Sequence, residues 1–298
     1  LKGAFGRLRE NREMATLGNL VEALAEEAVE SGGDDEVLAL ARELTTPGIA
    51  SQLVVRLGET RDEGQKARFI RLVPILGKEM ALALADALGE ARDRYQRRSY
   101  MDAMVAMGPT GLEVAQTMVE DPRWFVVRNG VSLLGEIGGE EMVSHLTSTL
   151  ANTDPRVRRE TVLALAKVGG DDASMLLQGM LGDSEAEVRA MACRAVGNLK
   201  VEKSFKTLMK LLEEDDDEDV QVESLQALGR LGDPGAVPLI EKRAAKGLFS
   251  KPNREIRIAA YRALAGIGTP HAVKLLEKAT KDSDTGIRTV AKNLLKDR

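Results

Sequence analysis

One helical phrase recurs along this chain of 298 residues. It reads DSEAEVRAMACRAVGNL at Asp183–Leu199, and related phrases stand at Asp154–Gly170, Asn253–Gly268 and Asp282–Leu295. In each phrase a turn of acidic or amide residues is followed by Val or Ile, then Arg, then small and apolar residues at helical spacing. A chain built from one repeated helical unit buries each unit only against its neighbours, so the phrase predicts a solenoid.

The period of the phrase is nearly constant. With its Arg taken as position zero, the equivalent residues are Lys66, Arg97, Val127, Arg158, Arg189, Gln221, Arg257 and Arg288. Successive members lie 31, 30, 31, 31, 32, 36 and 31 residues apart. Around Arg189 the apolar residues share one helix face: Val188, Ala192, Ala195, Val196 and Leu199. This spacing predicts the first helix of each repeat.

A second apolar run follows each phrase and keeps the same register. Its equivalent positions are Leu146, Leu177, Leu208 and Ile240. Two helices joined by a Gly-containing turn in each repeat predict an all-α fold, an α-solenoid (superhelix) of stacked antiparallel helix pairs. Runs of β-branched residues with a period of two, which would indicate a sheet, are absent from the sequence.

The repeat divides the chain into two parts. Residues 1–33 stand outside it and predict either a helix that caps the first repeat or a linker helix from a preceding domain. Residues 34–298 are expected to form the solenoid, with a degenerate first pair at 34–58, seven full helix pairs and a final half repeat at 282–298. Because the chain opens with Leu1 rather than Met, we expect a processed chain or a segment of a larger protein.

The phrase also carries a family resemblance. The run Asp-x-Asp/Glu-x-x-Val/Ile-Arg, then Ala-x-x-Ala-Leu, then Gly, resembles the short HEAT-like repeats that are also found in phycobilin lyases. The resemblance extends from about Asp34 to the C-terminus and is strongest from Asp121 onward. It implies a helical solenoid but no particular function, because such repeats serve many unrelated roles.

Two residues interrupt the expected helices. Pro74 lies inside an otherwise helical run, where it removes a backbone donor and bends the helix. Gly130 lies inside another helix, where Gly costs roughly 1 kcal/mol relative to Ala. We therefore expect a close approach of two helices at Gly130.

Composition restricts the partners and the compartment. A net charge of −5 argues against a general nucleic-acid binder, which is usually strongly basic. The single Cys193 lies on an apolar helix face, which predicts a core residue and a reducing environment. The sequence has no run of about 20 apolar residues that could span a bilayer and no signal-peptide pattern. We expect a cytoplasmic protein.

The sequence predicts no catalytic residue, no cofactor and no metal site. His145 and His271 are far apart, and there is no His-Glu dipeptide of the kind that deoxyhypusine hydroxylase, a HEAT-like metal enzyme, uses in pairs. A P-loop and a nucleophile elbow are also missing. The acidic run Glu213–Asp219 lacks the alternating ligands, the Gly and the distant Glu of a Ca²⁺ loop, so we expect a solvated turn.

The arginines at position zero suggest a structural ladder. Four of them follow an acid by four residues, in the pairs Asp93–Arg97, Asp154–Arg158, Glu185–Arg189 and Asp284–Arg288. Arg189 and Arg288 also follow a second acid by six residues, Asp183 and Asp282. A guanidinium can bind turn carboxylates and carbonyls with several donors at once. We expect Gln221 to keep part of this bonding without the charge.

Six residues are candidates for binding a partner. Trp124, the only Trp, is expected either to cover the groove between repeats or to anchor a partner. Leu248 and Phe249 lie in the insertion Lys246–Asn253, which we expect to protrude and to expose them as an apolar anchor. Arg98, Arg128 and Arg159 occupy position +1, and Arg92, Arg94, Arg123 and Arg156 lie in nearby turns. They predict a basic ridge on the outer face, either a solvated face or a docking site for an acidic protein segment.

These observations favour a non-enzymatic protein–protein interaction scaffold or regulatory module. The expected partners are proteins; no membrane partner is expected, and nucleic acid is disfavoured. One alternative is an accessory subunit of an enzyme, such as a partner that resembles a chromophore lyase. The other alternative is a nucleic-acid-binding protein.

Overall fold

The computed structural model describes residues 14–30, 32, 35–91, 93–245 and 253–296. Within these ranges the chain is all-α and contains no β-strand, as the sequence predicts. The helices form two compact units, residues 1–138 and 139–298.

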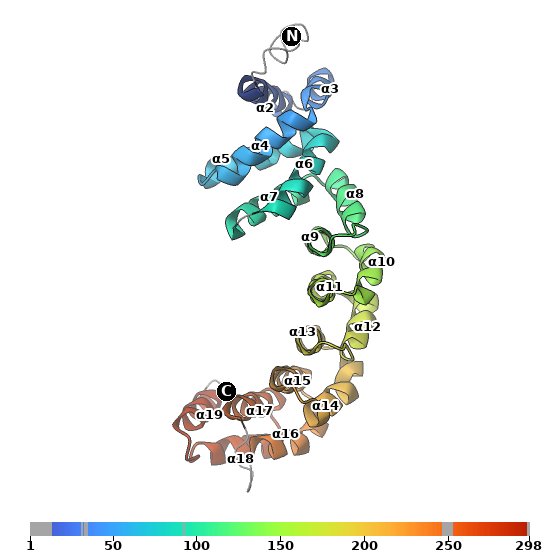
Figure 1. Cartoon of the computed structure of the whole chain (residues 1–298). Helices are drawn as coiled ribbons and strands as arrows, with labels where there is room; N and C mark the ends of the chain where they lie inside the picture. Colours follow the sequence, from blue (N-terminus) through green and yellow to red (C-terminus); the bar gives the residue numbers. More distant parts are fainter. Residues whose placement is uncertain (1–13, 31, 33–34, 92, 246–252, 297–298) are drawn as a thin grey trace. The chain divides into compact units, whose positions relative to one another are not determined.

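Unit 1 contains α2 to α9 (Figure 1). The helices are α2 (Met14–Glu30), α3 (Asp35–Leu44), α4 (Pro47–Glu59), α5 (Glu63–Leu72), α6 (Gly77–Glu90), α7 (Arg94–Ala106), α8 (Pro109–Met118) and α9 (Trp124–Ile137). Helix α2 packs on α3 and α4 and buries Leu17, Val21 and Ala25. This contact suits a helix that covers the first repeat.

Both predicted interruptions occur in unit 1. Helix α5 ends at Leu72, and a 3₁₀ turn, η1 (Val73–Ile75), contains Pro74. A Cβ at Gly130 on α9 would lie 2.8 Å from Cβ of Met118 on α8. The close approach expected at Gly130 is therefore confirmed.

Unit 2 contains α10 to α19 (Figure 1). The helices are α10 (Met142–Thr147), α11 (Pro155–Val168), α12 (Gly170–Met180), α13 (Ala186–Asn198), α14 (Phe205–Glu214), α15 (Glu218–Leu231), α16 (Val237–Ala244), α17 (Arg254–Ile267), α18 (Pro270–Ala279) and α19 (Thr285–Lys296). Short 3₁₀ turns are η2 (Ser148–Ala151), η3 (Glu202–Ser204) and η4 (Pro234–Ala236). The first helices α11, α13, α15 and α17 lie side by side in one layer. The second helices α12, α14, α16 and α18 form the other layer.

The core of unit 2 lies between the two helix layers. The predicted second-helix positions Leu146, Leu177, Leu208 and Ile240 are all fully buried. On α13, Val188, Ala192, Ala195 and Val196 are buried as predicted, and Leu199 is half-buried. The first helices come closest at small residues. A Cβ added at Gly197 would lie 2.7 Å from Cα of Ala227, and one at Gly229 would lie 2.7 Å from Cα of Ala263.

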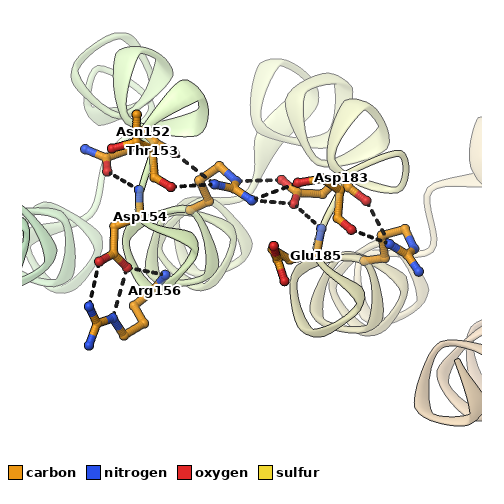
Figure 2. Close-up of polar contacts among 9 residues, drawn as sticks. Asn152, Thr153, Asp154, Arg156, Asp183 and Glu185 are labelled. Atoms are coloured by element: carbon orange, nitrogen blue, oxygen red, sulfur yellow. Dashed lines mark hydrogen bonds and ion pairs between the residues drawn. The ribbon is translucent and has the colours of Figure 1, made fainter.

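The ladder of position-zero arginines joins successive repeats of unit 2. Arg158 donates from Nε and Nη2 to the Asp183 carboxylate at 2.8 and 2.7 Å, and from Nη1 to the Asn152 carbonyl at 2.9 Å (Figure 2). Arg189 binds the Asp215 carboxylate in the same way, at 2.8 and 2.9 Å, and also binds the Asp183 carbonyl. Each guanidinium therefore ties its own turn to the turn of the next repeat.

Two further position-zero residues of unit 2, Arg257 and Gln221, bind in related ways. Arg257 donates to the Ala244 carbonyl at 2.9 Å and to Oδ2 of Asp282 at 2.6 Å. Gln221 donates from Nε2 to the Asp215 carbonyl at 2.6 Å, so it keeps the carbonyl bond without the charge, as predicted.

The acids four residues before the arginines are not the partners, which corrects the expectation from spacing. Asp154 is the N-cap of α11, where it accepts from the N–H of Arg156, and its carboxylate also binds the Arg156 guanidinium (Figure 2). Asp284 likewise accepts from backbone N–H groups of its own helix and pairs with Arg254. A carboxylate at a helix N-terminus is used by the free N–H groups there, so the arginine binds the acid of the next repeat.

The acidic run also differs from the solvated turn that we expected. Asp215 is only 5% exposed because it pairs with Arg189, and its Oδ1 accepts from the N–H of Asp217. Asp217 in turn caps α15. Glu213 and Glu214 are exposed and pair with lysines. The run therefore combines a largely shielded ion pair, a helix cap and a solvated segment.

We expect the ladder to be sensitive to acid. Burial raises the pKa of the Asp183 and Asp215 carboxyls, but hydrogen bonds from arginines and backbone N–H groups outweigh it, so both pKa values lie below the ordinary one. A carboxyl with a lowered pKa in the folded state stabilises fully above its unfolded pKa of about 3.9, and this stability is lost as the pH falls through the folded pKa. The difference in urea midpoint between the wild type and Arg189→Ala should therefore shrink below about pH 4. A constant difference down to about pH 2 would contradict this coupling.

Candidate partner-binding site

The first helices of each unit have an exposed face that lies opposite the core. Position +1 points to this face, because the core positions −1, +3 and +6 lie on the other side of the helix. In unit 2, Arg159 on α11 donates from Nη1 to Oε1 of Glu187 on α13 at 2.9 Å. Arg194 on α13 donates to Glu223 on α15 at 2.5 Å. Two ion pairs thus join neighbouring first helices in unit 2.

Position +1 in unit 1 holds the other two arginines of the predicted ridge. The Arg98 side chain on α7 is 77% exposed, and its Nε lies 3.3 Å from Oδ1 of Asp102. Arg128 on α9 is half-buried, donates to Oδ1 of Asn129 at 2.9 Å and lies 5.7 Å from the centroid of the Trp124 ring. Of the three ridge residues, Arg98 is the most accessible to a partner.

A groove lies beside Arg98 on this face of unit 1. Its volume is about 400 Å³, and the residues that line it come from α7 and α9: Arg94, Arg97, Arg98, Met101, Asp102, Val105, Ser132 and Glu136. The three arginines are exposed, whereas Met101 and Val105 are half-buried. The groove therefore combines an apolar floor with a basic edge.

Arg97 occupies position zero of its repeat but does not take part in the ladder. Asp121 stands where Asp183 and Asp215 stand in unit 2, six residues before the next position zero. Its carboxylate is bound by Nε and Nη2 of Arg123 at 2.9 and 2.8 Å, and hydrogen bonds from Arg123 lower the pKa of Asp121 to about 2. Among the described residues, the guanidinium groups of Arg94 and Arg97 have no hydrogen bond or ion pair. Arg97 is therefore an exposed cation in the groove.

Arg97 is the residue that reasoning from the sequence assigned wrongly. Its position in the repeat predicted a ladder arginine, and Arg94 was named only as a turn residue near the predicted basic ridge. A signal was present in the sequence, because the motif Asp-Pro-Arg at Asp121–Arg123 is shifted by two residues relative to Asp154–Arg156. The shift puts Arg123 next to the carboxylate that Arg97 would otherwise bind.

Trp124 lies at the start of α9 and is half-buried. Its ring meets the Phe125 ring edge to face, with centroids 6.0 Å apart. Phe125 lines a second groove of about 690 Å³ together with Leu82, Met118 and Asp121. The remaining candidates, Leu248 and Phe249, lie outside the described residues.

Cys193 and His271, two side chains of unit 2 that could be reactive, each have a partner within the fold. Cys193 is fully buried, its Sγ lies 3.4 Å from Oγ of Ser224, and burial raises its pKa to about 12. His271 is exposed and lies 2.9 Å from Glu241. In the ranges that the structure describes, no three His, Cys, Asp or Glu residues are grouped as a metal site.

None of the helices in these ranges is long and apolar enough to cross a membrane.

The repeats can be compared with known proteins. Residues 112–186 and 173–247 match the HEAT repeat family. The Escherichia coli protein YibA has 17% identity and a TM-score of 0.54 over 84% of this chain and 96% of its own. An engineered protein has 22% identity and a TM-score of 0.46 over 99% of this chain and 91% of its own. A designed armadillo repeat protein in complex with the peptide (KR)4 has 21% identity and a TM-score of 0.44 over 62% of this chain and 98% of its own.

No curated protein matches the chain in sequence. The matched repeats, the all-helical fold and the likeness to YibA agree with one another. Residues 112–247 therefore contain HEAT repeats, and the described residues form an all-α solenoid of helix pairs with a fold similar to that of YibA.

Proposed function

We propose that this protein is a non-enzymatic interaction scaffold that binds a partner protein on the exposed face of its first helices. The observation that carries the proposal is the open groove between α7 and α9, where exposed arginines stand over half-buried apolar side chains. Stacked repeats present such side chains along an extended surface, which suits the binding of another chain. The fold leaves these arginines exposed, because the core of each repeat lies on the opposite side of the helix.

The perturbed titratable groups support a structural role rather than a catalytic one. Strongly shifted pKa values often mark active sites, but structural ion pairs shift them too. Here the lowered pKa values of Asp183 and Asp215 arise within the ladder, and that of Asp121 arises from Arg123. The raised pKa of Cys193 comes first from burial. Each of these shifts is explained by burial in the fold or by hydrogen bonds from a neighbouring group.

The proposal predicts partner capture that depends on charge. The full chain, immobilised and exposed to a lysate of its source organism at low salt, should enrich a specific protein that mass spectrometry identifies. Reversal of all three ridge residues, Arg98→Glu, Arg128→Glu and Arg159→Glu, should slow association with that protein strongly at low salt and weakly at high salt. Arg98→Glu alone should account for most of the effect, because the Arg98 side chain is 77% exposed, whereas Arg159 is 36% exposed and Arg128 is half-buried.

The matched control is Lys206→Glu, which reverses an exposed cation of unit 2 on the second helix α14 rather than on the face of the first helices. The scaffold proposal fails if the wild-type chain enriches no protein relative to a blank matrix. The role of the ridge fails if the triple variant, folded by circular dichroism, associates at the wild-type rate at both salt concentrations.

A further inference from the structure

We propose that the groove between α7 and α9 binds an acidic peptide segment. Carboxylates of the segment would bind Arg94 and Arg97, and an apolar side chain beside them would pack on Met101 and Val105. The inference rests on the proposed scaffold function and names its site and the chemistry of its partner.

The basic edge of the groove is complementary to carboxylates. Arg94 and Arg97 lie one helical turn apart on α7, so their guanidinium groups stand on the same side of the helix. Both are exposed, and neither guanidinium has a hydrogen bond or ion pair among the described residues. Guanidinium groups match the fork of a carboxylate and bind it with two parallel hydrogen bonds. Two such groups side by side suit successive acidic side chains of one segment.

The break in the ladder explains why Arg97 is available. In unit 2 the position-zero arginines Arg158, Arg189 and Arg257 each bind a carboxylate of the following repeat. The equivalent carboxylate for Arg97 is Asp121, which Arg123 already holds. Arg97 is therefore exposed, whereas its equivalents in unit 2 are held by carboxylates. Its replacement should change the free energy of unfolding little.

The rest of the groove favours a peptide over a polyanion. Met101 and Val105 follow on the same face of α7, and Met adapts its shape to varied apolar side chains. Asp102 and Glu136 also line the groove, and their negative charge opposes a ligand with phosphate at every step. The chain carries a net charge of −5, and nucleic-acid binding usually needs a long basic surface. A segment that alternates acidic and apolar residues offers carboxylates to the arginines and apolar side chains to Met101 and Val105.

Fluorescence anisotropy of the full chain with a labelled peptide tests the inference. The probe is a short fluorescein-labelled peptide in which Glu and Leu alternate. Matched control peptides replace Glu with Lys, which removes the charge match, or Leu with Ser, which removes the apolar contact. We expect saturable binding of the Glu–Leu peptide, weakened by salt, and weaker binding of both controls.

Variants assign the binding to the groove. Arg97→Gln should weaken binding about tenfold or more, and Arg94→Gln with Arg97→Gln should weaken it further. Arg156→Gln, a change of the same kind at an exposed arginine of unit 2, should leave binding unchanged. The urea midpoint of the double variant should equal that of the wild type, because neither guanidinium is bonded within the described structure.

Three results would overturn the inference. They are an affinity that does not change in the double variant, equal binding of the Lys–Leu peptide, and displacement of the probe by single-stranded DNA with a steep salt dependence. Failure of the groove and failure of the scaffold are distinguishable. If the double variant captures the partner protein as well as the wild type does, only the groove assignment is wrong. If the wild type captures no protein but binds the peptide through Arg97, only the scaffold proposal is wrong.

Discussion

Replacement of Arg189 by Ala is expected to lower the free energy of unfolding by about 3 kcal/mol. The Arg189 side chain is 18% exposed and Asp215 is 5% exposed, so the ion pair is largely shielded from water. Its removal leaves the Asp215 carboxylate without its cation and the Asp183 and Ser184 carbonyls without their shared donor. An uncompensated buried charge costs more than the loss of an exposed pair. The change should appear as a lower urea midpoint.

The control for this prediction is Arg156→Ala. Arg156 also binds an aspartate, Asp154, with two donors, but its side chain is 51% exposed. Exposed pairs contribute about 0–1 kcal/mol, so the urea midpoint should change little. A double-mutant cycle of Arg189→Ala with Asp215→Ala should give a coupling energy of at least about 1 kcal/mol. Equal midpoints for Arg189→Ala and the wild type would show that the ladder does not stabilise the repeats.

The contrast between Arg189 and Arg97 separates the two roles of position zero. Arg189→Ala should destabilise the fold, because its side chain joins two turns. The equivalent change at Arg97 should leave stability unchanged and weaken peptide binding. Under the proposed function, one repeated motif would provide both the bonds between repeats and, where those bonds are missing, a binding residue.

The periodic part of the fold could be predicted from the sequence, because periodicity and burial have a direct physical link. Leu146, Leu177, Leu208 and Ile240 were placed in the core by spacing alone, and all four are fully buried. An apolar position that recurs on one helix face meets the neighbouring helices in the same way in each repeat, so its spacing predicts its burial. The close approach of two helices at Gly130 was also predicted, because Gly inside a helix needs a compensating contact.

The partners of the ladder could not be predicted in the same way. Spacing along the chain favours the acid four residues before each Arg, but Asp93, Asp154 and Asp284 accept hydrogen bonds from N–H groups of their own helices. The true partner belongs to the next repeat and comes close only through stacking. The same limit applies to Arg97. Its exposure depends on a competition between Arg97 and Arg123 for Asp121, which requires positions in space.

The close approach of α15 and α17 was likewise not evident from the sequence, and Gly229 shows its energetic importance. A Cβ at Gly229 would lie 2.7 Å from Cα and 3.1 Å from Cβ of Ala263. The atom at 2.7 Å belongs to the backbone, so a side-chain rotation cannot relieve the contact, and the two helices would have to separate. Helices α13, α15 and α17 form the most closely packed row in unit 2. A larger residue at Gly229 would therefore disturb the contact on which the stacking depends.

We expect Gly229→Val to lower the free energy of unfolding by about 3 kcal/mol, because forced separation of packed helices costs more than the better helix propensity of Val returns. The control is the same substitution at Gly179 on α12, where an added Cβ meets no atom within 4 Å. Gly179→Val should stay within about 0.5 kcal/mol of the wild type. Urea unfolding of both variants, followed by circular dichroism, gives the comparison. If Gly229→Val unfolds at the same urea concentration as Gly179→Val, α15 and α17 can separate without cost. Close packing of the first helices would then not be what holds the repeats of unit 2 together.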